Sequence, residues 1–373
     1  MYAQISEKKY LGKIVKEFPP TKDNPRNGTG GFYRMDNGVI ALVYDRYHGE
    51  SNADDAPCDI AVTYSYDDGE TFTEPEIVMT CADVDAYNIC SVSLLRLQDG
   101  SIAMFYIKRA NGTERKTAIC YRKTTDFKTF SEEIEVTDDG YWILNPQRVI
   151  RCKNGNIIVP VAHHAWRKLA EEERALYSNN EYTILPATNY FFISSDDGKT
   201  FKKSNKLELV LDDGIIHDGL QEPGVQELDD GRLFAYARTS LGRHYQSYST
   251  DGGMTWSTPL PSKFTGPLSP LDFIRLSSGE FAIVYNPVPW YPGGPSNSPW
   301  RGRTPFVFRV GDGNLNKIGD AYILDDDPNG HYCYTAFLEC EDSLLMVYMA
   351  GGENGLKGLS NLRIRKIKKS EFL

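Results

Sequence analysis

The sequence predicts an all-β fold, a six-bladed β-propeller built as a single domain over residues 1–373. Three observations lead to this prediction. An apolar hairpin pattern occurs six times along the chain, and a short motif containing Asp and Gly recurs between the hairpins. The 32 glycines and 20 prolines also indicate a globular chain that is rich in turns.

Each predicted hairpin consists of two apolar strands around a short turn that usually ends in glycine. Asn-Gly and Asp-Gly supply the positive φ angles that two-residue turns require. Successive turns lie 48 to 76 residues apart, a spacing that suits four strands per repeat. Such sheets cannot bury both faces alone, so six of them are expected to pack radially around an axis. The hairpins are FYRMDNGVIALVY (32–44), LLRLQDGSIAMFY (94–106), VIRCKNGNIIVPV (149–161), VQELDDGRLFAYA (225–237), FIRLSSGEFAIVY (273–285) and FLECEDSLLMVYM (337–349).

Within a repeat, the expected order is the hairpin, a third strand such as DIAVTYS (59–65), the recurring motif and a fourth strand. In this motif, S-x-D-x-G-x-T-[FW], the Asp can bond the backbone of its own turn and the Gly can adopt a conformation costly for other residues. The aromatic ring can pack between neighbouring sheets. These aspartates are therefore predicted to be structural rather than catalytic. The copies lie at Asp67, Asp196 and Asp251, with a degraded copy, TTDFKTF, at 124–130.

One segment departs from the β pattern. Residues 165–176, AWRKLAEEERAL, have a helical composition and fall between the second and third strands of the third repeat. We expect a short helical insertion there, which is either a plain surface helix or a lid.

Composition excludes several classes of partner. The chain has 41 Lys and Arg against 51 Asp and Glu, a net charge of −10, which disfavours nucleic acid and anionic membrane surfaces. The N-terminal residues lack the apolar core of a signal peptide, and no apolar run is long enough to span a bilayer. A cytoplasmic protein is expected.

The seven cysteines show no CxxC spacing and are expected to be free thiols, and no metal or other cofactor is predicted.

The recurring motif resembles the Asp-box, or BNR repeat, of sialidases (neuraminidases) and their relatives, where it lies on the face away from the active site. The segment from Gly219 to Trp256 strengthens this resemblance. A Glu begins one strand, an Arg follows on the next strand, and an Asp-box closes the repeat. The resemblance implies that Glu222 is the partner of the nucleophile and that Arg238 is one of three arginines that bind the substrate carboxylate.

Tyr334 matches the sialidase nucleophile, because YTAF (334–337) resembles the Tyr-Ser-x-Leu of that family. An offset in the repeat supports its pairing with Glu222. Glu222 lies nine residues before the turn residue Gly231, and Tyr334 lies nine before Ser343, so both are expected at the start of an innermost strand. A neutral phenol suits a sialoside, because the carboxylate on the anomeric carbon would repel a carboxylate nucleophile.

The resemblance also implies two further arginines. Arg26 is chosen for the first position over Arg34, because Arg34 shares its repeat position with Arg96, Arg151 and Arg275 and is expected on the hairpin surface. Arg303, directly before the strand TPFVF, is chosen over Arg301 for the third position. Three guanidinium groups from three repeats could hold one carboxylate through charge-assisted hydrogen bonds.

The resemblance to sialidases also implies a general acid on the loop before the third strand of the first repeat, about four residues before another acid. Asp55 lies four residues before Asp59, which opens that strand, and is chosen as the acid; Asp54 and Asp59 are the alternatives. Several other residues could line a sugar pocket. They are His163, His164, Trp166, Trp290, Tyr291 and Trp300.

These residues together predict a retaining exo-α-sialidase-like glycoside hydrolase of carbohydrate metabolism. Its substrate is expected to be a glycan with a terminal acidic sugar, foremost sialic acid. Two alternatives remain: a hydrolase of another acidic sugar, such as a 2-keto acid sugar or a uronate, and a catalytically silent propeller that binds glycans.

Overall fold

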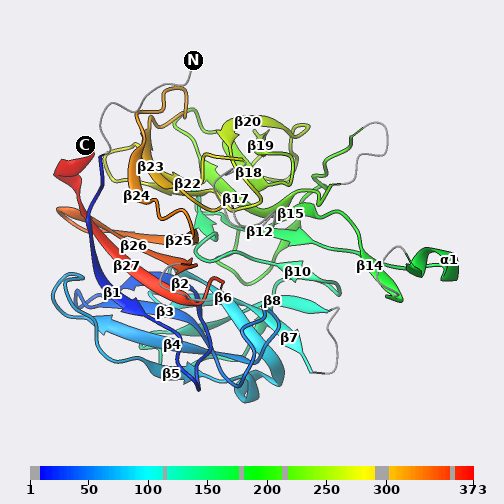
Figure 1. The fold of residues 1–373 in the computed structure, drawn as a ribbon, viewed down its shortest axis with the longest axis horizontal. Coiled ribbons are helices and arrows are strands. Elements are labelled where there is room, and N and C mark those ends of the chain that lie inside the picture. The colour runs from blue at the N-terminus through cyan, green and yellow to red at the C-terminus, as the bar shows by residue number, and fades with distance from the viewer. Residues whose placement is uncertain (1–8, 112–115, 176–179, 212–216, 290–301, 353–357) are drawn as a thin grey trace.

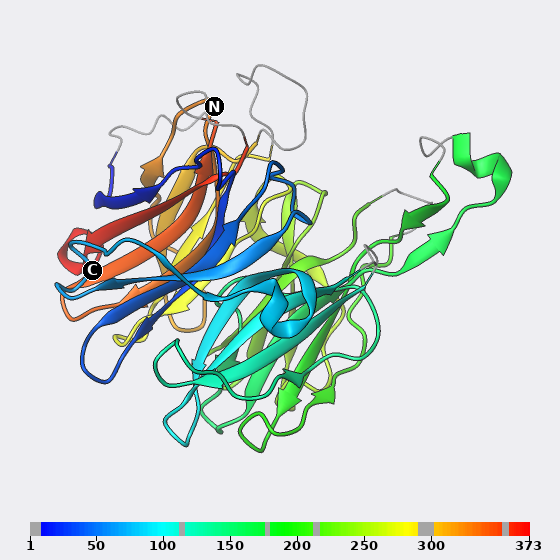
Figure 2. The ribbon, with the colours of Figure 1, turned by 90° about the horizontal axis from the view of Figure 1, so that it is seen from below.

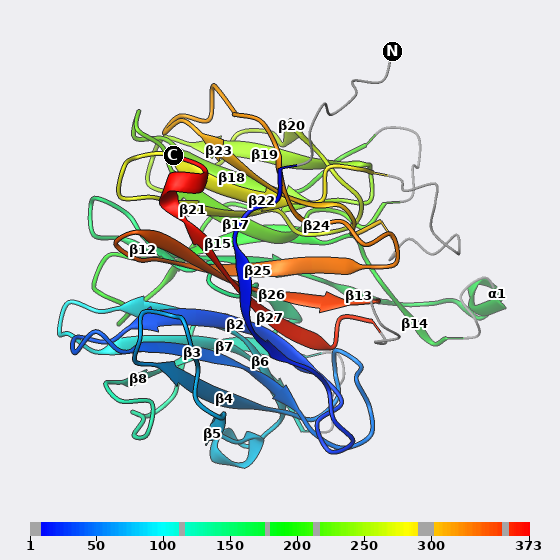
Figure 3. The same ribbon diagram turned by 60° about the vertical axis from the view of Figure 1, so that its left-hand side comes forward.

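The computed structural model describes residues 9–111, 116–175, 180–211, 217–289, 302–352 and 358–373. Within them the chain forms antiparallel sheets that lie side by side around a centre (Figures 1 and 3). All six predicted hairpins form, and the glycines in five of their turns have positive φ angles of 84° to 103°. The arrangement is an all-β propeller, as predicted.

The first two repeats form one sheet of eight strands. One half contains β2 (Asn27–Arg34), β3 (Ile40–Tyr47), β4 (Cys58–Ser65) and β5 (Glu76–Met79). After a short 3-10 helix (Cys81–Val84), the other half contains β6 (Ala86–Arg96), β7 (Ile102–Ala110), β8 (Thr117–Thr124) and β9 (Ile134–Glu135).

Four other sheets, of four or five strands each, complete the ring. One contains β10 (Trp142–Ile143), β11 (Ile150–Arg151), β12 (Ile157–His163), β15 (Thr188–Ser194) and β16 (Lys202–Lys203). The next sheet contains β17 (Gln221–Glu227), β18 (Leu233–Arg238), β19 (Arg243–Ser249) and β20 (Leu260–Thr265). The sheet after it contains β21 (Asp272–Arg275), β22 (Phe281–Tyr285), β23 (Phe306–Gly311) and β24 (Tyr322–Asp325). The last contains β25 (His331–Glu339), β26 (Ser343–Gly351), β27 (Asn361–Lys368) and β1 (Lys13–Phe18).

The prediction of six separate four-stranded blades holds only in part. Among the described residues, three separate sheets have four strands and one has five, and the first two repeats share a larger sheet of eight strands. The reason is a parallel pairing of Cys58 on β4 with Asn88 on β6, which connects the two halves of the eight-stranded sheet.

The two ends of the chain meet in the last sheet. Strand β1 pairs antiparallel with β27, with Lys13 opposite Lys366 and Phe18 opposite Leu362. Figure 1 shows the blue β1 beside the red β27. The N-terminal strand therefore closes the ring.

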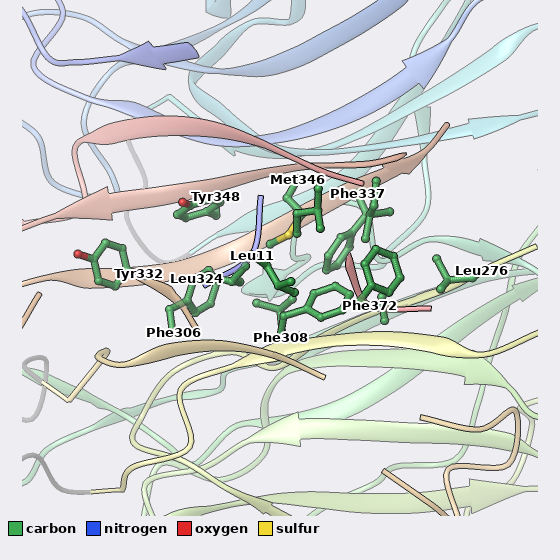
Figure 4. Close-up of a cluster of buried hydrophobic side chains, with 14 of the residues drawn as sticks. Leu11, Leu276, Phe306, Phe308, Leu324, Tyr332, Phe337, Met346, Tyr348 and Phe372 are labelled. Atoms are coloured by element: carbon green, nitrogen blue, oxygen red, sulfur yellow. The ribbon is translucent and has the colours of Figure 1, made fainter. Parts of the chain in front are cut away.

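The core lies mainly between neighbouring sheets. Figure 4 shows one such interface, where Phe306 and Phe308 of β23 face Met346 and Tyr348 of β26. The rings of Phe306 and Tyr348 lie 5.2 Å apart, and all four side chains are at most 1% exposed. Burial of this apolar area, at roughly 25 cal/mol per Å², holds adjacent sheets together.

The Asp-box turns have the predicted structure. Asp251 Oδ1 accepts hydrogen bonds from Ser249 Oγ (2.8 Å) and from the backbone N–H of Thr255 (2.9 Å), and Asp251 Oδ2 accepts one from Thr255 Oγ1 (2.6 Å). Asp67 and Asp196 repeat these contacts. The ring of Trp256 stacks on Phe191 of the preceding sheet, with centroids 4.0 Å apart. The motif thus fastens one sheet to the next.

A further turn of this kind was not predicted. Asp312, after β23, accepts hydrogen bonds from the backbone N–H groups of Asn314, Asn316 and Lys317. Its sequence, GDGNLNK, lacks the Ser, Thr and aromatic residue of the motif. The backbone geometry is retained because the Asp alone supplies the acceptors.

The prediction of a helical insertion is only partly right. The helix α1 is restricted to Glu171–Arg174, and the flanking residues form a two-stranded ribbon of β13 (Trp166–Lys168) and β14 (Tyr182–Ile184). Figure 2 shows the ribbon and α1 projecting away from the sheets. Composition favoured a helix because AEEERAL contains good helix formers, whereas the pairing of β13 with β14 joins residues distant in sequence. In the described part of the chain, no helix is long and apolar enough to cross a membrane.

Candidate active site

Glu222 and Tyr334 occupy equivalent β-bulges at the start of two innermost strands. On β17, two residues between Gln221 and Gly224 oppose a single residue of β18, and the same irregularity lies between Cys333 and Ala336 of β25. The φ angles are 50° at Glu222 and 58° at Tyr334. This left-handed conformation costs a non-glycine residue about 1–2 kcal/mol and is concentrated at functional sites. The offset of nine residues therefore marks a shared local structure.

The Asp-boxes lie at the other end of the blades. In the fourth repeat, Gln221 at the start of β17 pairs with Arg238 at the end of β18, whereas Ser249, which begins the Asp-box, pairs with Leu233 at the start of β18. The structural turns and the bulges thus occupy opposite faces of the propeller.

Tyr334, Glu222 and Arg238 form a closed hydrogen-bonded triangle. The Tyr334 hydroxyl donates to Glu222 Oε1 at 2.8 Å, and Arg238 Nη1 donates to Glu222 Oε1 at 2.8 Å and to the Tyr334 hydroxyl at 3.2 Å. Burial, reinforced by the negative charge of Glu222, raises the pKa of Tyr334 above its usual value. The phenol is therefore neutral at neutral pH, and its proton already points to a carboxylate.

Two atoms of this triangle remain without a partner among the described residues. Glu222 Oε2 and Arg238 Nε are buried and make no hydrogen bond there. Unsatisfied buried polar groups cost free energy and require an explanation, one of which is a ligand that supplies the partner.

The structure brings the other two predicted arginines to the same tyrosine. The Arg303 guanidinium lies over the Tyr334 ring, 5.6 Å from its centroid, and the side chain is 3% exposed. Arg26 lines the same cavities as Tyr334, stacks on the Tyr47 ring at 4.8 Å, and donates from Nη1 to an oxygen of Asp54 at 2.5 Å. Three arginines from three repeats therefore surround one phenol.

The alternative Arg34 lies elsewhere. It contacts Asp68, next to the first Asp-box, at 2.7 Å and donates to the carbonyl of Gly38. Arg151 makes the equivalent contacts with Asp197 and Gly155. The repeated arginines are thus structural residues of the Asp-box face, as expected. The alternative Arg301 lies outside the described residues.

Two adjoining cavities open beside Tyr334. One of about 250 Å³ extends from Arg26, Glu222, Arg238 and Tyr334 to a wall formed by the second and third repeats. The other cavity, of about 220 Å³, is lined in part by Arg303. The residues common to both are Arg26, Asp54 and Tyr334.

The three candidate acids have different surroundings. Asp54 lines both cavities and pairs with Arg26, whereas Asp55 is exposed and lines neither of them. Asp59 Oδ1 accepts a hydrogen bond from the backbone N–H of Cys81 at 2.8 Å, and its other oxygen lies 3.5 Å from His48. Asp59, the second residue of β4, thus makes structural contacts where that strand begins. Asp54 has the most direct access to the cavity, and Asp55 remains the sequence prediction.

The predicted pocket residues are divided between cavity and core. His164 lines the larger cavity, and burial lowers its pKa to about 4, so it is neutral at neutral pH. His163 packs against Trp142 at 4.5 Å. Trp166 meets the edge of Tyr141, which also lines the cavity, at 6.0 Å. Trp290, Tyr291 and Trp300 lie outside the described residues.

Sequence reasoning missed several cavity residues. Arg109 donates to the Tyr141 hydroxyl at 3.2 Å, and Asn145 is 3% exposed with its Nδ2 atom lacking a partner in the described structure. Ser91 could have been found, since it lies nine residues before Gly100 and has a φ of 60° on the equivalent bulge of β6. Arg109 and Asn145 carry no such offset signal.

Polar residues close the axis beneath the site. The Gln147 side chain accepts from the backbone N–H of Phe337 (2.6 Å) and donates to its carbonyl (2.7 Å). Arg148 pairs with Asp272 at 2.5 Å, and both side chains are at most 5% exposed. A separate cavity of about 440 Å³ is lined by Gln147, Arg148 and Asp272, together with the repeated arginines Arg151 and Arg275. The candidate site is therefore a pocket.

This geometry suits capture of an anion and attack by an oxygen nucleophile. Guanidinium groups bind carboxylates through charge-assisted hydrogen bonds, and a phenol next to a carboxylate can be deprotonated as it attacks. In the described part of the chain, no cluster of three His, Cys, Asp or Glu side chains is placed to hold a metal ion.

The fold and the site define a β-propeller with Asp-box turns on one face and an arginine-rich pocket on the other. The family model of the BNR repeat-like domain matches residues 47–347, and the chain belongs to this family. No curated protein matches the sequence.

Several solved structures have the same fold. A protein of unknown function from Dyadobacter fermentans matches with a TM-score of 0.67 at 18% identity, over 95% of this chain and 98% of that one. The Hadza microbial sialidase Hz136 matches with a TM-score of 0.69 at 15% identity, over 93% and 66%. The NanB sialidase of Streptococcus pneumoniae matches with 0.67 at 13% identity, over 97% and 71%. At these identities the likeness establishes the fold.

Proposed function

We propose that this protein is a retaining exo-α-sialidase-like glycoside hydrolase that removes a terminal acidic sugar, foremost sialic acid, from a glycan. The observation that carries the proposal is the hydrogen bond from the Tyr334 hydroxyl to Glu222, surrounded by three arginines. Sialidases are known among glycosidases for a tyrosine nucleophile. The sialidase names of similar structures agree with this proposal.

In the proposed reaction, Arg26, Arg238 and Arg303 bind the substrate carboxylate and orient the anomeric carbon above Tyr334. Glu222 takes the phenol proton as the phenol oxygen forms a bond to the anomeric carbon. An acid from the loop of Asp54 and Asp55 protonates the leaving oxygen as the glycosidic bond breaks. Water then attacks the anomeric carbon and gives a proton to the loop carboxylate, and the glycosyl–tyrosine bond breaks as Glu222 returns its proton to the phenol oxygen.

We also propose that the eight-stranded sheet acts as two blades, which gives a six-bladed propeller. Each half repeats the hairpin and third-strand order of the other sheets, and each inner strand carries the same bulge. A single residue pair, Cys58 with Asn88, joins the halves.

The proposed activity is tested with fluorogenic glycosides of sialic acid, its deaminated counterpart and a uronic acid. We expect wild type to cleave at least one and Tyr334→Phe to lose most turnover while retaining affinity, because the phenol takes part in bond making. A 3-fluoro sialosyl fluoride should label Tyr334 and leave Tyr332, two residues away, unlabelled.

The outcomes separate the alternatives. Cleavage of the deaminated sugar or the uronide alone identifies a hydrolase of another acidic sugar. Binding without cleavage identifies a silent glycan-binding propeller. Inversion at the anomeric carbon, or label on another residue, excludes the tyrosine double displacement.

A further inference from the structure

Two arginines of the site have carboxylate partners of very different kinds. Arg238 pairs with Glu222, whose side chain is 12% exposed and belongs to strand β17. Arg26, with a side chain 11% exposed, pairs with Asp54, whose side chain is 90% exposed and lies in the loop between β3 and β4. A nearly buried cation is therefore neutralised by an acid that remains in contact with solvent.

The other contacts of Arg26 position its guanidinium without neutralising it. Nη1 donates to the carbonyl of Asn52 at 3.2 Å, Nη2 lies 4.0 Å from Met349 Sδ, and the group stacks on the Tyr47 ring. A carbonyl, a thioether and a phenol ring carry no full charge. Among the described residues, the carboxylate on Arg26 thus comes from Asp54.

Asp54 occupies the position where an anionic ligand would meet Arg26. Both cavities beside Tyr334 are lined by Arg26 and by Asp54. The Asp54 side chain is already 90% exposed, so it can leave Arg26 for solvent with little further change in its exposure, and another carboxylate can take its place. A ligand carboxylate that also contacts Arg238 and Arg303 makes more charge-assisted bonds than Asp54 makes alone.

We propose that Asp54 is a replaceable counter-ion of Arg26, which the carboxylate of the substrate displaces when it binds. This inference rests on the proposed function. A neutral sugar leaves Asp54 paired with Arg26, whereas an acidic sugar releases Asp54 at the mouth of the cavity, beside the bond to be cleaved. Binding of the substrate carboxylate thereby releases the acid. A neutral sugar does not release it, so the site discriminates against neutral substrates.

Displacement changes the proton affinity of Asp54. The surrounding protein opposes its ionisation, but the charge of Arg26, with those of Arg303 and Arg238 further away, lowers the pKa of Asp54 below its usual value. Loss of Arg26 as a partner raises this pKa again, so ligand binding takes up protons, and affinity increases as the pH falls toward that value. Titratable groups that line the two cavities beside Asp54 are Asp45, Tyr47, Cys90, Arg109, Tyr141, His164, Glu222, His331 and Tyr334.

Calorimetry with unreactive ligands tests the proposal. The probes are the 2,3-unsaturated analogues of N-acetylneuraminic acid and of its deaminated counterpart, which keep the carboxylate and lack a leaving group. We expect Asp54→Asn to bind a probe about threefold to tenfold more tightly than wild type, because the competing carboxylate is removed. Glu50→Gln is the matched control, since it removes another exposed charge of the same loop, and should bind as wild type does.

Proton linkage provides the decisive readout. In buffers of different ionisation enthalpy, wild type and Glu50→Gln should take up a fraction of a proton per ligand, more at pH 4.5 than at pH 6.5, and Asp54→Asn should not. Equal affinity of all three proteins, weaker binding by Asp54→Asn, or uptake that persists in Asp54→Asn would overturn the counter-ion proposal and leave the proposed function intact. Failure of every protein to bind either probe would overturn both.

Discussion

At the scale of single residues, the function proposed for the site depends on how firmly each polar side chain is held in place. Glu222 and Tyr334 are fixed by bulged backbone and by each other, whereas Asp54 is held by one contact. This difference follows from their positions, since the first two belong to strands and the third to a loop. Strand positions give precise geometry, and loop positions allow exchange of partners.

Replacement of Arg238 tests carboxylate capture. Arg238→Ala should weaken binding of an acidic sugar by about 1.5 to 3 kcal/mol, tenfold to a hundredfold, because a charge-assisted partner is lost. Arg232→Ala is the control, because Arg232 lies on the same hairpin but pairs with the exposed Asp230. Titration of both variants with an unsaturated acidic sugar measures the difference. Equal affinity of Arg238→Ala and wild type would show that Arg238 does not contact the carboxylate.

How much of the site could be predicted also depends on whether a residue lies on a strand or in a loop. Glu222 and Tyr334 were chosen on a resemblance to sialidases, and the repeat offset that supported the choice corresponds to a bulge at a fixed place on each strand. Arg26 and Arg303 were found with the help of resemblance and lie at the same phenol. The acid was narrowed only to three candidates, because Asp54 and Asp55 lie in a loop, and a loop has no register that ties residue number to position.

At the scale of elements, the local chemistry of turns determined what could be predicted. Hairpin turns and Asp-boxes were predictable because Asn-Gly, Asp-Gly and S-x-D-x-G specify their own backbone conformation. The ribbon of β13 and β14 was missed because its pairing partners lie fourteen or more residues apart, from Lys168 to Tyr182. The helix that the composition between them predicted is restricted to Glu171–Arg174.

The Asp-box of the fourth repeat should contribute to stability and not to catalysis. Asp251→Ala should lower the free energy of unfolding by about 1–2 kcal/mol, because several hydrogen bonds in the turn are lost. Asp230→Ala, in the turn of the β17–β18 hairpin, should have a smaller effect, and kcat/KM should be unchanged in both. Denaturant unfolding and initial rates measure the two quantities. An inactive Asp251→Ala protein that is fully folded would contradict the structural role.

The stability difference should also depend on pH. Hydrogen bonds from Thr255 lower the pKa of Asp251 to about 2. A carboxyl with a lowered pKa in the folded state stabilises the fold above its ordinary pKa, and this contribution is lost as the pH falls. The difference between wild type and Asp251→Ala should therefore be constant above about pH 5 and shrink toward pH 2.

At the scale of the whole molecule, the ring is held by interfaces between sheets and by the pairing of its ends. Sequence periodicity predicted the propeller because every repeat has the same hairpin, but it did not reveal that Cys58 pairs with Asn88 to merge two repeats into one sheet. Such pairings depend on how repeats approach in space, which a repeat pattern does not encode.

Removal of the N-terminal strand tests the ring closure. Deletion of residues 1–18 should lower the unfolding temperature and promote association, because β27 loses its partner and becomes an exposed edge. Phe18, which is 6% exposed and packs against Tyr44 at 5.3 Å, is lost with it. Deletion of residues 1–8 is the control, since it retains β1. Scanning calorimetry and size-exclusion chromatography provide the measurements, and identical behaviour of the two deletions would contradict closure by β1.

The pairing of β1 with β27 also affects the order of events during synthesis. Lys13 leaves the ribosome early, but its partner Lys366 is made 353 residues later. At roughly 5–20 residues per second, β1 waits at least some tens of seconds for its partner. During that interval β1 is an unpaired strand available to other nascent chains.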